Sequence, residues 1–462
     1  MRRVGRGDGG HAAGRAGPDD HDARTGRSHA AKLIRFALAS GAVIVAADPP
    51  YHPEPSLSEN ELSPQAIEFV LRMGRAFHRH GFSAARVEEV MVRIAERLGL
   101  PLAQIFSTPT SIMAAFGPLG TQSSHLLRVE PGSMNLAQVS QLDRLAIDVV
   151  QGEVAPVGGI ARLRAIEDHP EVYGPLASIG AFVTASGTVS VFLGGGRKEL
   201  VAASVIGFAT GLLALYAARR PRLQRVFEPL VALMASVIAG VVARLWLPHS
   251  VYVSTLAGLI VQIPGFSLTV AVRELSTQHL ASGTARFASA TATFLGIGFG
   301  VALGGRLVAI ALGERADVAA LAFPLWVLPI AVALAGLAFA VILQAERRDI
   351  LRIIVIGLIA VAAGRIGARV LGLELGAFVG ALAVGVIGNL FSRLRNRPSL
   401  ILMVPGILML VPGTIGYRSI SALLEAEVVT GVGTLFRMLL TAVAIASGLL
   451  IADLVSPTRR FV

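Results

Sequence analysis

Long apolar runs in the second part of the chain constrain its fold most strongly. Several runs without a charged residue are close to the roughly 20 residues that an α-helix needs to cross a bilayer. These runs cover 175–193, 200–218, 229–243, 251–272, 287–305, 318–343, 375–392 and 398–416. Two further apolar segments, 350–372 and 434–455, carry charged residues inside or near their ends. The sequence therefore predicts a polytopic α-helical membrane protein with about ten transmembrane helices.

The composition agrees with this class. Of the 462 residues, 53% are hydrophobic and 15% are charged, whereas soluble domains carry about a quarter of charged residues. A soluble enzyme is therefore excluded. The net charge of +11 is expected in loops that face the cytoplasm, so it does not indicate a nucleic-acid partner. The absence of cysteine excludes disulfides and thiolate metal sites, and we predict no metal and no cofactor.

The residues before 175 divide into a tail and a small domain. Residues 1–59 are expected to be a disordered basic tail. Its short apolar segment, 32–50, resembles a cleaved signal peptide, or else reflects a start site placed too early. Residues 60–174 are predicted to form an α+β domain, because segments of helical period surround β-like stretches within 102–130. The basic loop at 219–225 places this domain and both ends of the membrane portion in the cytoplasm.

Two helices are predicted at the start of this domain. Ser63 followed by Pro64 is typical of a helix start, and that helix should run to about His80. The next segment, 83–100, has its apolar residues on one face, as expected of an amphipathic helix that packs on a core. Helical spacing returns at 135–150 and 157–167.

The membrane portion contains an internal repeat at an offset of 148 residues. Five positions of the first half align without a gap on five of the second half. Gly240, Gly258, Pro264, Gly265 and Gly283 align with Gly388, Gly406, Pro412, Gly413 and Gly431. The halves, 175–315 and 316–456, would each hold five helices. An odd number of helices per half predicts an inverted repeat, the arrangement of alternating-access transporters.

The two aligned Pro-Gly pairs are predicted to break helices inside the membrane. Proline removes a backbone hydrogen bond, and the glycine after it lets the chain turn. A half-helix amino end carries partial positive charge and would suit a substrate carboxylate, although a packing kink without a ligand is the alternative. Arg286 could stand at the mouth of this pathway or extend to the lipid headgroups. Arg365 and Arg369 could hold a carboxylate or anchor the helix at the interface.

In these motifs the chain resembles the threonine/serine exporter family. The resemblance covers about 60–455 and rests on segments in both portions: HGFSAARVEEVMVRIAERLGL (80–100), STPTSI (107–112), LAQVSQLDRLAIDVVQGEV (136–154), FLGGGRKE (192–199), IPGFSLTVAVRELSTQHLASGTARF (263–287) and VPGILMLVPGTIGYRS (404–419). It implies a cytoplasmic amino-terminal domain, ten spans in two halves, and export of small hydroxy amino acids driven by the proton gradient. The family's split forms also include proteins that look like dicarboxylate exporters.

The resemblance also selects candidate residues. The substrate pathway would include Pro264, Gly265, Gly283, Arg286, Pro405, Gly406, Pro412, Gly413, Tyr417 and Arg418. Thr108, Pro109 and Thr110 form a matching motif of unknown role, which a strand followed by a turn would also explain.

The main hypothesis is a secondary transporter that exports threonine or serine across a bacterial plasma membrane. The lipid bilayer, a small-molecule substrate and protons would be its partners, and a homo-oligomer is left open. Proton coupling needs a titratable group, for which Asp453, Glu374 and Glu274 are the candidates. Asp453 could equally lie at the membrane interface.

Two alternatives concern the amino-terminal domain. A membrane-tethered hydrolase would use hydroxyl and imidazole groups that lie close in sequence: His78, His80, Ser83, Glu88 and the serines and threonines of 107–111. However, no nucleophile elbow, metal-binding His-Glu-x-x-His or phosphate loop is present. A regulatory or assembly module is the other alternative.

Overall fold

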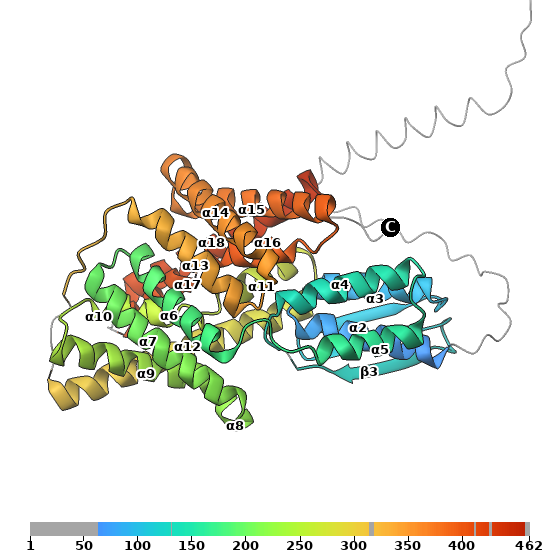
Figure 1. Cartoon of the computed structure of the whole chain (residues 1–462), viewed down its shortest axis with the longest axis horizontal. Helices are drawn as coiled ribbons and strands as arrows, with labels where there is room; N and C mark the ends of the chain where they lie inside the picture. The colour runs from blue at the N-terminus through green and yellow to red at the C-terminus, as the bar shows by residue number, and fades with distance from the viewer. Residues whose placement is uncertain (1–62, 131, 314–317, 411–412, 425–426, 458–462) are drawn as a thin grey trace, which may run out of the picture. The chain divides into compact units, whose positions relative to one another are not determined.

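The computed structural model describes residues 63–130, 132–313, 318–410, 413–424 and 427–457 (Figure 1). The predicted tail with its apolar segment, the boundary at 315/316 and Pro412 lie outside these ranges. The described chain is mainly helical and contains one three-stranded sheet.

An α+β region, residues 64–167, comes first. Its helices and strands are α2 (Pro64–Arg79), α3 (Ala84–Arg97), β1 (Gln104–Thr108), β2 (Ser111–Phe116), β3 (Ser123–Arg128), α4 (Leu136–Val150) and α5 (Pro156–Glu167). The predicted start of α2 is confirmed: Ser63 occupies the N-cap, its side chain accepts a hydrogen bond from the Ala66 amide, and Pro64 follows. The four predicted helices are present to within a few residues of their expected ends.

The sheet is antiparallel in the order β1-β2-β3. The β-like stretch that precedes Gly117 is divided into two strands by a tight turn at Pro109 and Thr110. One face of the sheet contributes Ile112, Ala114 and Phe116 to a core that also contains the apolar faces of α2, α3 and α4. The α+β region therefore has a hydrophobic core of its own.

A helical region, residues 175–455, follows. Its elements are α6 (Pro175–Phe192), α7 (Arg197–Ala218), α8 (Pro221–Gln224), α9 (Phe227–Leu245), α10 (Val251–Gly258), α11 (Gly265–Ser276), α12 (Leu280–Leu312), α13 (Val327–Ile342), the 3-10 turn η1 (Arg347–Asp349), α14 (Ile350–Leu371), α15 (Leu373–Arg395), α16 (Leu400–Leu408), α17 (Gly413–Leu424) and α18 (Val428–Val455).

Within the described ranges, seven helices are long and apolar enough to cross a membrane, instead of the ten spans expected. They are α6, α7, α9, α12, α14 with η1, α15 and α18. The three other expected spans differ for identifiable reasons. The span at 318–343 contains only the 16-residue helix α13. The spans at 251–272 and 398–416 are each divided into two shorter helices, α10 with α11 and α16 with α17.

The long helices pack closely where small residues face a neighbouring backbone. A Cβ atom on Gly300 of α12 would lie 2.3 Å from the carbonyl oxygen of Pro229 on α9. A Cβ atom on Gly448 of α18 would lie 2.6 Å from the carbonyl oxygen of Phe378 on α15. Both contacts require glycine, because any side chain would separate the two helices. Gly300 and Gly448 are 148 residues apart, which is the repeat offset in the sequence.

Candidate functional site

Two interrupted helices meet inside the helical region. α10 ends at Gly258, and α11 begins at Gly265 with Pro264 in its N-cap position, so the predicted break is present there. α16 ends at Leu408 and α17 begins at Gly413. α11 contacts both α16 and α17. The two pairs of half-helices, far apart in the sequence, are therefore neighbours.

A cavity of about 240 Å³ lies between α11, α16 and the α+β region. α11 contributes Phe266, Thr269, Val270 and Arg273, and α16 contributes Leu400, Met403, Val404 and Ile407. The α+β region contributes the loop before α3 and the facing side chains of α3 and α4. The cavity is thus a small-molecule-sized space at the junction of two regions, which is a common position for ligand sites.

An ion pair borders the cavity on the side of the helical region. Arg273 of α11 donates from Nη2 to Oδ2 of Asp453 on α18 over 2.5 Å. The other carboxylate oxygen of Asp453 accepts a hydrogen bond of 2.9 Å from the buried side-chain amide of Asn389 on α15. About a third of the Arg273 side chain and of the Asp453 side chain is exposed. Three helices therefore hold one accessible pair of opposite charges.

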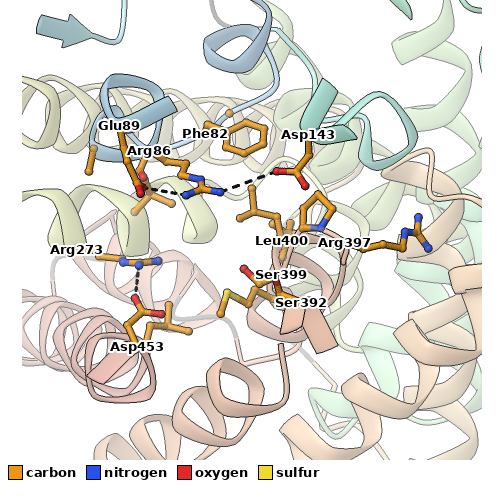
Figure 2. A pocket seen from close by; sticks show the side chains of 18 of the residues that line it. Phe82, Arg86, Glu89, Asp143, Arg273, Ser392, Arg397, Ser399, Leu400 and Asp453 are labelled. Atoms are coloured by element: carbon orange, nitrogen blue, oxygen red, sulfur yellow. Dashed lines mark hydrogen bonds and ion pairs between the residues drawn. The ribbon is translucent and has the colours of Figure 1, made fainter. Parts of the chain in front are cut away.

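A second set of charges borders the cavity on the side of the α+β region. Arg86 of α3 lies 2.9 Å from Oε2 of Glu89 and 4.0 Å from Oδ1 of Asp143 on α4. Figure 2 shows Arg86 with these two carboxylates on one side of the open space and Arg273 with Asp453 on the other. The two sets face each other across the cavity.

Arg397 also borders the cavity, but other groups neutralise its guanidinium. Nη1 donates to Oδ1 of Asp349 over 2.7 Å, and Nη2 donates to Oε2 of Glu346 over 3.0 Å. Nη2 also reaches the hydroxyl of Ser140 on α4, at 3.1 Å. In Figure 2 this side chain extends away from the space between Arg86 and Arg273. Arg397 therefore joins α4 to the helical region.

The pathway residues predicted around the breaks fall into two groups. Pro264 and Gly265 begin α11, which lines the cavity, and Pro405 and Gly406 lie within α16 between lining residues. Gly283 serves packing: a Cβ atom there would lie 2.7 Å from Cγ of Leu275, so this glycine lets α12 approach α11.

Arg286 contacts the α+β region instead of bordering the cavity. Its Nη2 donates to the carbonyl of Phe82 over 3.2 Å, and its Nε lies 3.1 Å from Oε2 of Glu274. Oε1 of Glu274 accepts a hydrogen bond of 2.9 Å from the Ala84 amide, and Oε2 accepts one of 2.8 Å from Ser282. Because Ala84 is the first residue of α3, the buried carboxylate caps that helix from the helical region.

Tyr417 and Arg418 lie on α17. The Tyr417 ring packs against the ring of Tyr252 on α10, whereas Arg418 borders a second pocket of about 650 Å³. That pocket is also lined by Arg365, Arg437 and Glu374, and Arg437 Nε lies 3.4 Å from Oε1 of Glu374. It extends to Met409 and Leu410, which follow α16.

The Thr108–Pro109–Thr110 motif forms the turn between β1 and β2. The Thr108 hydroxyl interacts with the Ser111 hydroxyl at 2.9 Å and accepts from the Ser111 amide at 3.2 Å. The carbonyl of Thr108 is 2.7 Å from Nε2 of His78, which joins α2 to this turn. The motif thus shapes the hairpin.

The residues considered for a hydrolase have structural partners. Glu88 accepts the Ser107 amide at 2.8 Å, and its other oxygen lies 3.4 Å from Nε2 of His279, at the start of α12. Burial lowers the pKa of His78 and of His80, and each ring also has a backbone hydrogen bond. These groups connect elements of the fold, and the contacts described do not form a nucleophile–base pair.

Sequence reasoning missed Arg86, Asp143, Arg273 and Asn389. These residues lie in amphipathic or apolar helices, and only the packing of those helices assembles them. Arg273 could have been selected from the sequence, because it lies eight residues after Gly265 in the segment that carries the family resemblance. Glu274 is one of the candidate proton carriers, but its contacts make it a helix cap.

Comparison with protein-family models gives two matches. The model described as "Putative threonine/serine exporter" matches residues 68–308, and the model described as "Threonine/Serine exporter, ThrE" matches residues 329–455. No solved structure matches the chain.

Curated relatives occur in bacteria and yeasts. The chain is 26% identical to a threonine/serine exporter of Corynebacterium glutamicum, over 71% of this chain and 68% of the relative. It is also 26% identical to pheromone-regulated membrane protein 10 of Debaryomyces hansenii and of Eremothecium gossypii, over 76% and 77% of this chain. The chain spans 36% and 49% of the length of these two yeast proteins. Because the first family model alone matches more than half of the 462 residues, the chain belongs to the threonine/serine exporter family of multi-pass membrane transporters.

Proposed function

We propose that this protein is a secondary transporter that exports threonine, serine or a similar small hydroxy amino acid, driven by the proton gradient. The cavity between α11 and α16 carries the proposal, because it reaches from the α+β region to the half-helices at the Pro-Gly break. A substrate that enters there would meet the amino end of α11, where backbone N–H groups favour a carboxylate. The name of the Corynebacterium relative supports the same substrate class.

The proposed architecture is an inverted pair of five-helix units. α6, α7, α9, α10 with α11, and α12 would form the first unit, and α13, α14, α15, α16 with α17, and α18 the second. The offset of 148 residues and the equivalent contacts of Gly300 and Gly448 support this pairing. In this arrangement the α+β domain and both ends of the helical region face the cytoplasm of a bacterial cell, and the cavity is the inward opening of the pathway.

Asp453 is the proposed proton carrier. Of the three candidate carboxylates, Asp453 alone is among the lining residues of the cavity. Glu274 caps α3, and Glu374 pairs with Arg437 at the second pocket. Protonation of Asp453 would weaken its ion pair with Arg273 and so couple proton binding to the state of the inward opening.

A dicarboxylate exporter is the second candidate. The second pocket favours it, since its charged lining residues in the described part of the chain are three arginines and one glutamate. An excess of positive charge inside a membrane protein attracts anions. A substrate with two carboxylates would fit that pocket better than a zwitterion would.

Efflux from proteoliposomes distinguishes these functions. Vesicles that contain the protein are loaded with labelled threonine, serine or succinate, and a proton gradient is imposed. Gradient-dependent loss of threonine and serine supports the first proposal, and loss of succinate alone supports the second. No flux of any of the three would contradict both.

The role of Asp453 is tested in the same vesicles. Asp453→Asn should lose the response to the proton gradient, measured as the ratio of threonine efflux with and without the gradient in the same vesicles. Asp148→Asn is the matched control, because Asp148 forms an ion pair with Arg162 on the outside of the α+β region. Equal gradient responses in the two variants would remove Asp453 from the coupling mechanism.

A further inference from the structure

We propose that the cytoplasmic α+β domain supplies half of the substrate site: Arg86 and Asp143, with Arg273 and Asp453 of the helical region, bind the charged head of a zwitterionic amino acid. The inference rests on the proposed export function and adds a site and a role for the α+β region. Its basis is that two sets of charges, each with an arginine and at least one carboxylate, face each other across the cavity.

The cavity lining carries charges of both signs. Asp349 and Glu346 neutralise Arg397, and the other charged lining residues in the described part of the chain are two basic and three acidic ones: Arg86, Arg273, Glu89, Asp143 and Asp453. A zwitterion can insert between such pairs and exchange partners, because its carboxylate takes an arginine while its ammonium takes an aspartate. No charge is then left without a partner in a poorly solvated site. A dicarboxylate would bring two negative charges and release none.

The cavity also suits a small polar side chain. Ser83, Thr269, Ser392 and Ser399 are the hydroxyl-bearing residues that line it. The Thr269 hydroxyl already donates to the carbonyl of Gly265 over 3.0 Å, so its oxygen can accept from a substrate hydroxyl. The cavity volume of about 240 Å³ is smaller than that of pockets for drug-sized ligands, which have volumes of roughly 300 Å³ or more. A cavity of this volume suits a single amino acid.

The position of Arg86 is fixed by contacts between the two regions. Arg86 is the third residue of α3, and the Glu274 carboxylate on α11 caps that helix at Ala84. Arg273, which borders the cavity, directly precedes Glu274 on the same helix. A movement of α11 would therefore shift both sets of charges together. The α+β region therefore contributes side chains to the binding site.

Equilibrium binding of labelled threonine to the full chain in lipid nanodiscs tests the site. Arg86→Gln and Arg273→Gln should each weaken threonine binding about tenfold, the loss expected for a hydrogen bond to a charged group. Arg162→Gln is the matched control, since Arg162 also pairs with an aspartate of the α+β region but lies outside the cavity lining. Its threonine affinity should equal that of the unaltered protein.

A second variant distinguishes recognition from loss of folding. Asp143→Asn combined with Asp453→Asn leaves Arg86 and Arg273 opposite a single lining carboxylate, Glu89, which is an excess of one positive charge. Succinate should then bind more tightly than it does to the unaltered protein, while threonine binds more weakly. A merely unfolded protein would bind neither. Unchanged threonine binding by Arg86→Gln, or loss of both ligands by the double variant while it keeps its thermal unfolding temperature, would overturn the site. Unaltered protein that binds succinate but neither threonine nor serine would overturn the proposed function as well.

Discussion

The rings of Tyr252 on α10 and Tyr417 on α17 pack against each other, with centroids 5.6 Å apart and planes inclined by 48°. The Tyr417 side chain is buried. In Figure 1, α10 and α17 lie farther from α2–α5 than α11 and α16 do. The contact therefore joins the two half-helices on the side of the breaks that is remote from the cavity.

The sequence offset of 148 residues relates this contact to the cavity. At the offset of 148 residues, Tyr252 corresponds to Leu400 and Tyr417 corresponds to Thr269. Leu400 and Thr269 both line the cavity. α10 and α17 are thus in contact through two large aromatic rings, whereas their equivalents at this offset, α16 and α11, border the cavity. In an alternating-access transporter this is the pattern of a state that is open toward the α+β region and closed on the far side.

The first prediction follows for Tyr252→Ala, which should open the far side. Because the chain has no cysteine, Val270→Cys, at a partly exposed lining position of α11, provides a single reporter for a membrane-impermeant thiol reagent. The reporter should react only from the side of the α+β region in the otherwise unaltered chain, and from both sides when Tyr252→Ala is added. Tyr216→Ala, at an exposed tyrosine near the end of α7, is the control. The same one-sided labelling in the presence of Tyr252→Ala would show that the ring pair is not a barrier.

The second prediction concerns the break before α11. Pro264→Ala together with Gly265→Ala should favour a continuous helix, because both substitutions raise helix propensity. Export of labelled threonine should then fall by at least about tenfold, since a barrier increase of about 1.4 kcal/mol is sufficient for that change. Pro329→Ala, in the exposed first turn of α13, should leave export unchanged. Normal export by the double variant, inserted in the membrane at normal amounts, would exclude a role for the break.

Local signals explain which features could be predicted. The start of α2 and the break at Pro264 depend on residues adjacent in sequence, and both are found. The contact between Glu274 and Ala84 spans 190 residues, and the pair of Arg273 and Asp453 spans 180 residues, so no local pattern could indicate them.

The same reasoning explains the errors in the expected spans. The charge-free run 287–305 predicts a span that is shorter than the observed helix α12, which covers Leu280–Leu312. Arg286 and Arg306 lie inside this helix, and they ended the run at both sides. Arg286 is tolerated because Glu274 and the Phe82 carbonyl are its partners. Partners of this kind are known only once the fold is known.

The third prediction concerns the cap that joins the two regions. Glu274→Gln should weaken the attachment of α3, because the Ala84 amide loses a charged acceptor and Arg286 loses its carboxylate partner. The expected cost in local stability is about 1–3 kcal/mol. Hydrogen exchange of the amides in the first turn of α3 measures it. Glu96→Gln, at an exposed position of the same helix, is the control. Equal protection of these amides in both variants would contradict the capping role.

The last prediction is a dependence of the stability of the α+β region on pH. Burial lowers the pKa of His78 and His80 below the ordinary value of about 6.5. Below that value the unfolded chain binds protons that the folded chain does not bind, so stability should fall as the pH decreases from about 6.5 toward the folded pKa values. Above about 6.5 both states are neutral, and these two groups add no further pH dependence.

Hydrogen exchange of α2 and β1, corrected for the intrinsic effect of pH, measures this change. His78→Gln keeps a donor toward the Thr108 carbonyl but does not titrate, so it should remove part of the loss in stability, and His78→Gln with His80→Gln should remove most of it. His169→Gln, at an exposed position after α5, should retain the full loss. If the double variant lost stability on acidification as steeply as the unaltered chain, carboxylates would have to be responsible, since they are the other groups whose protonation destabilises a fold at low pH.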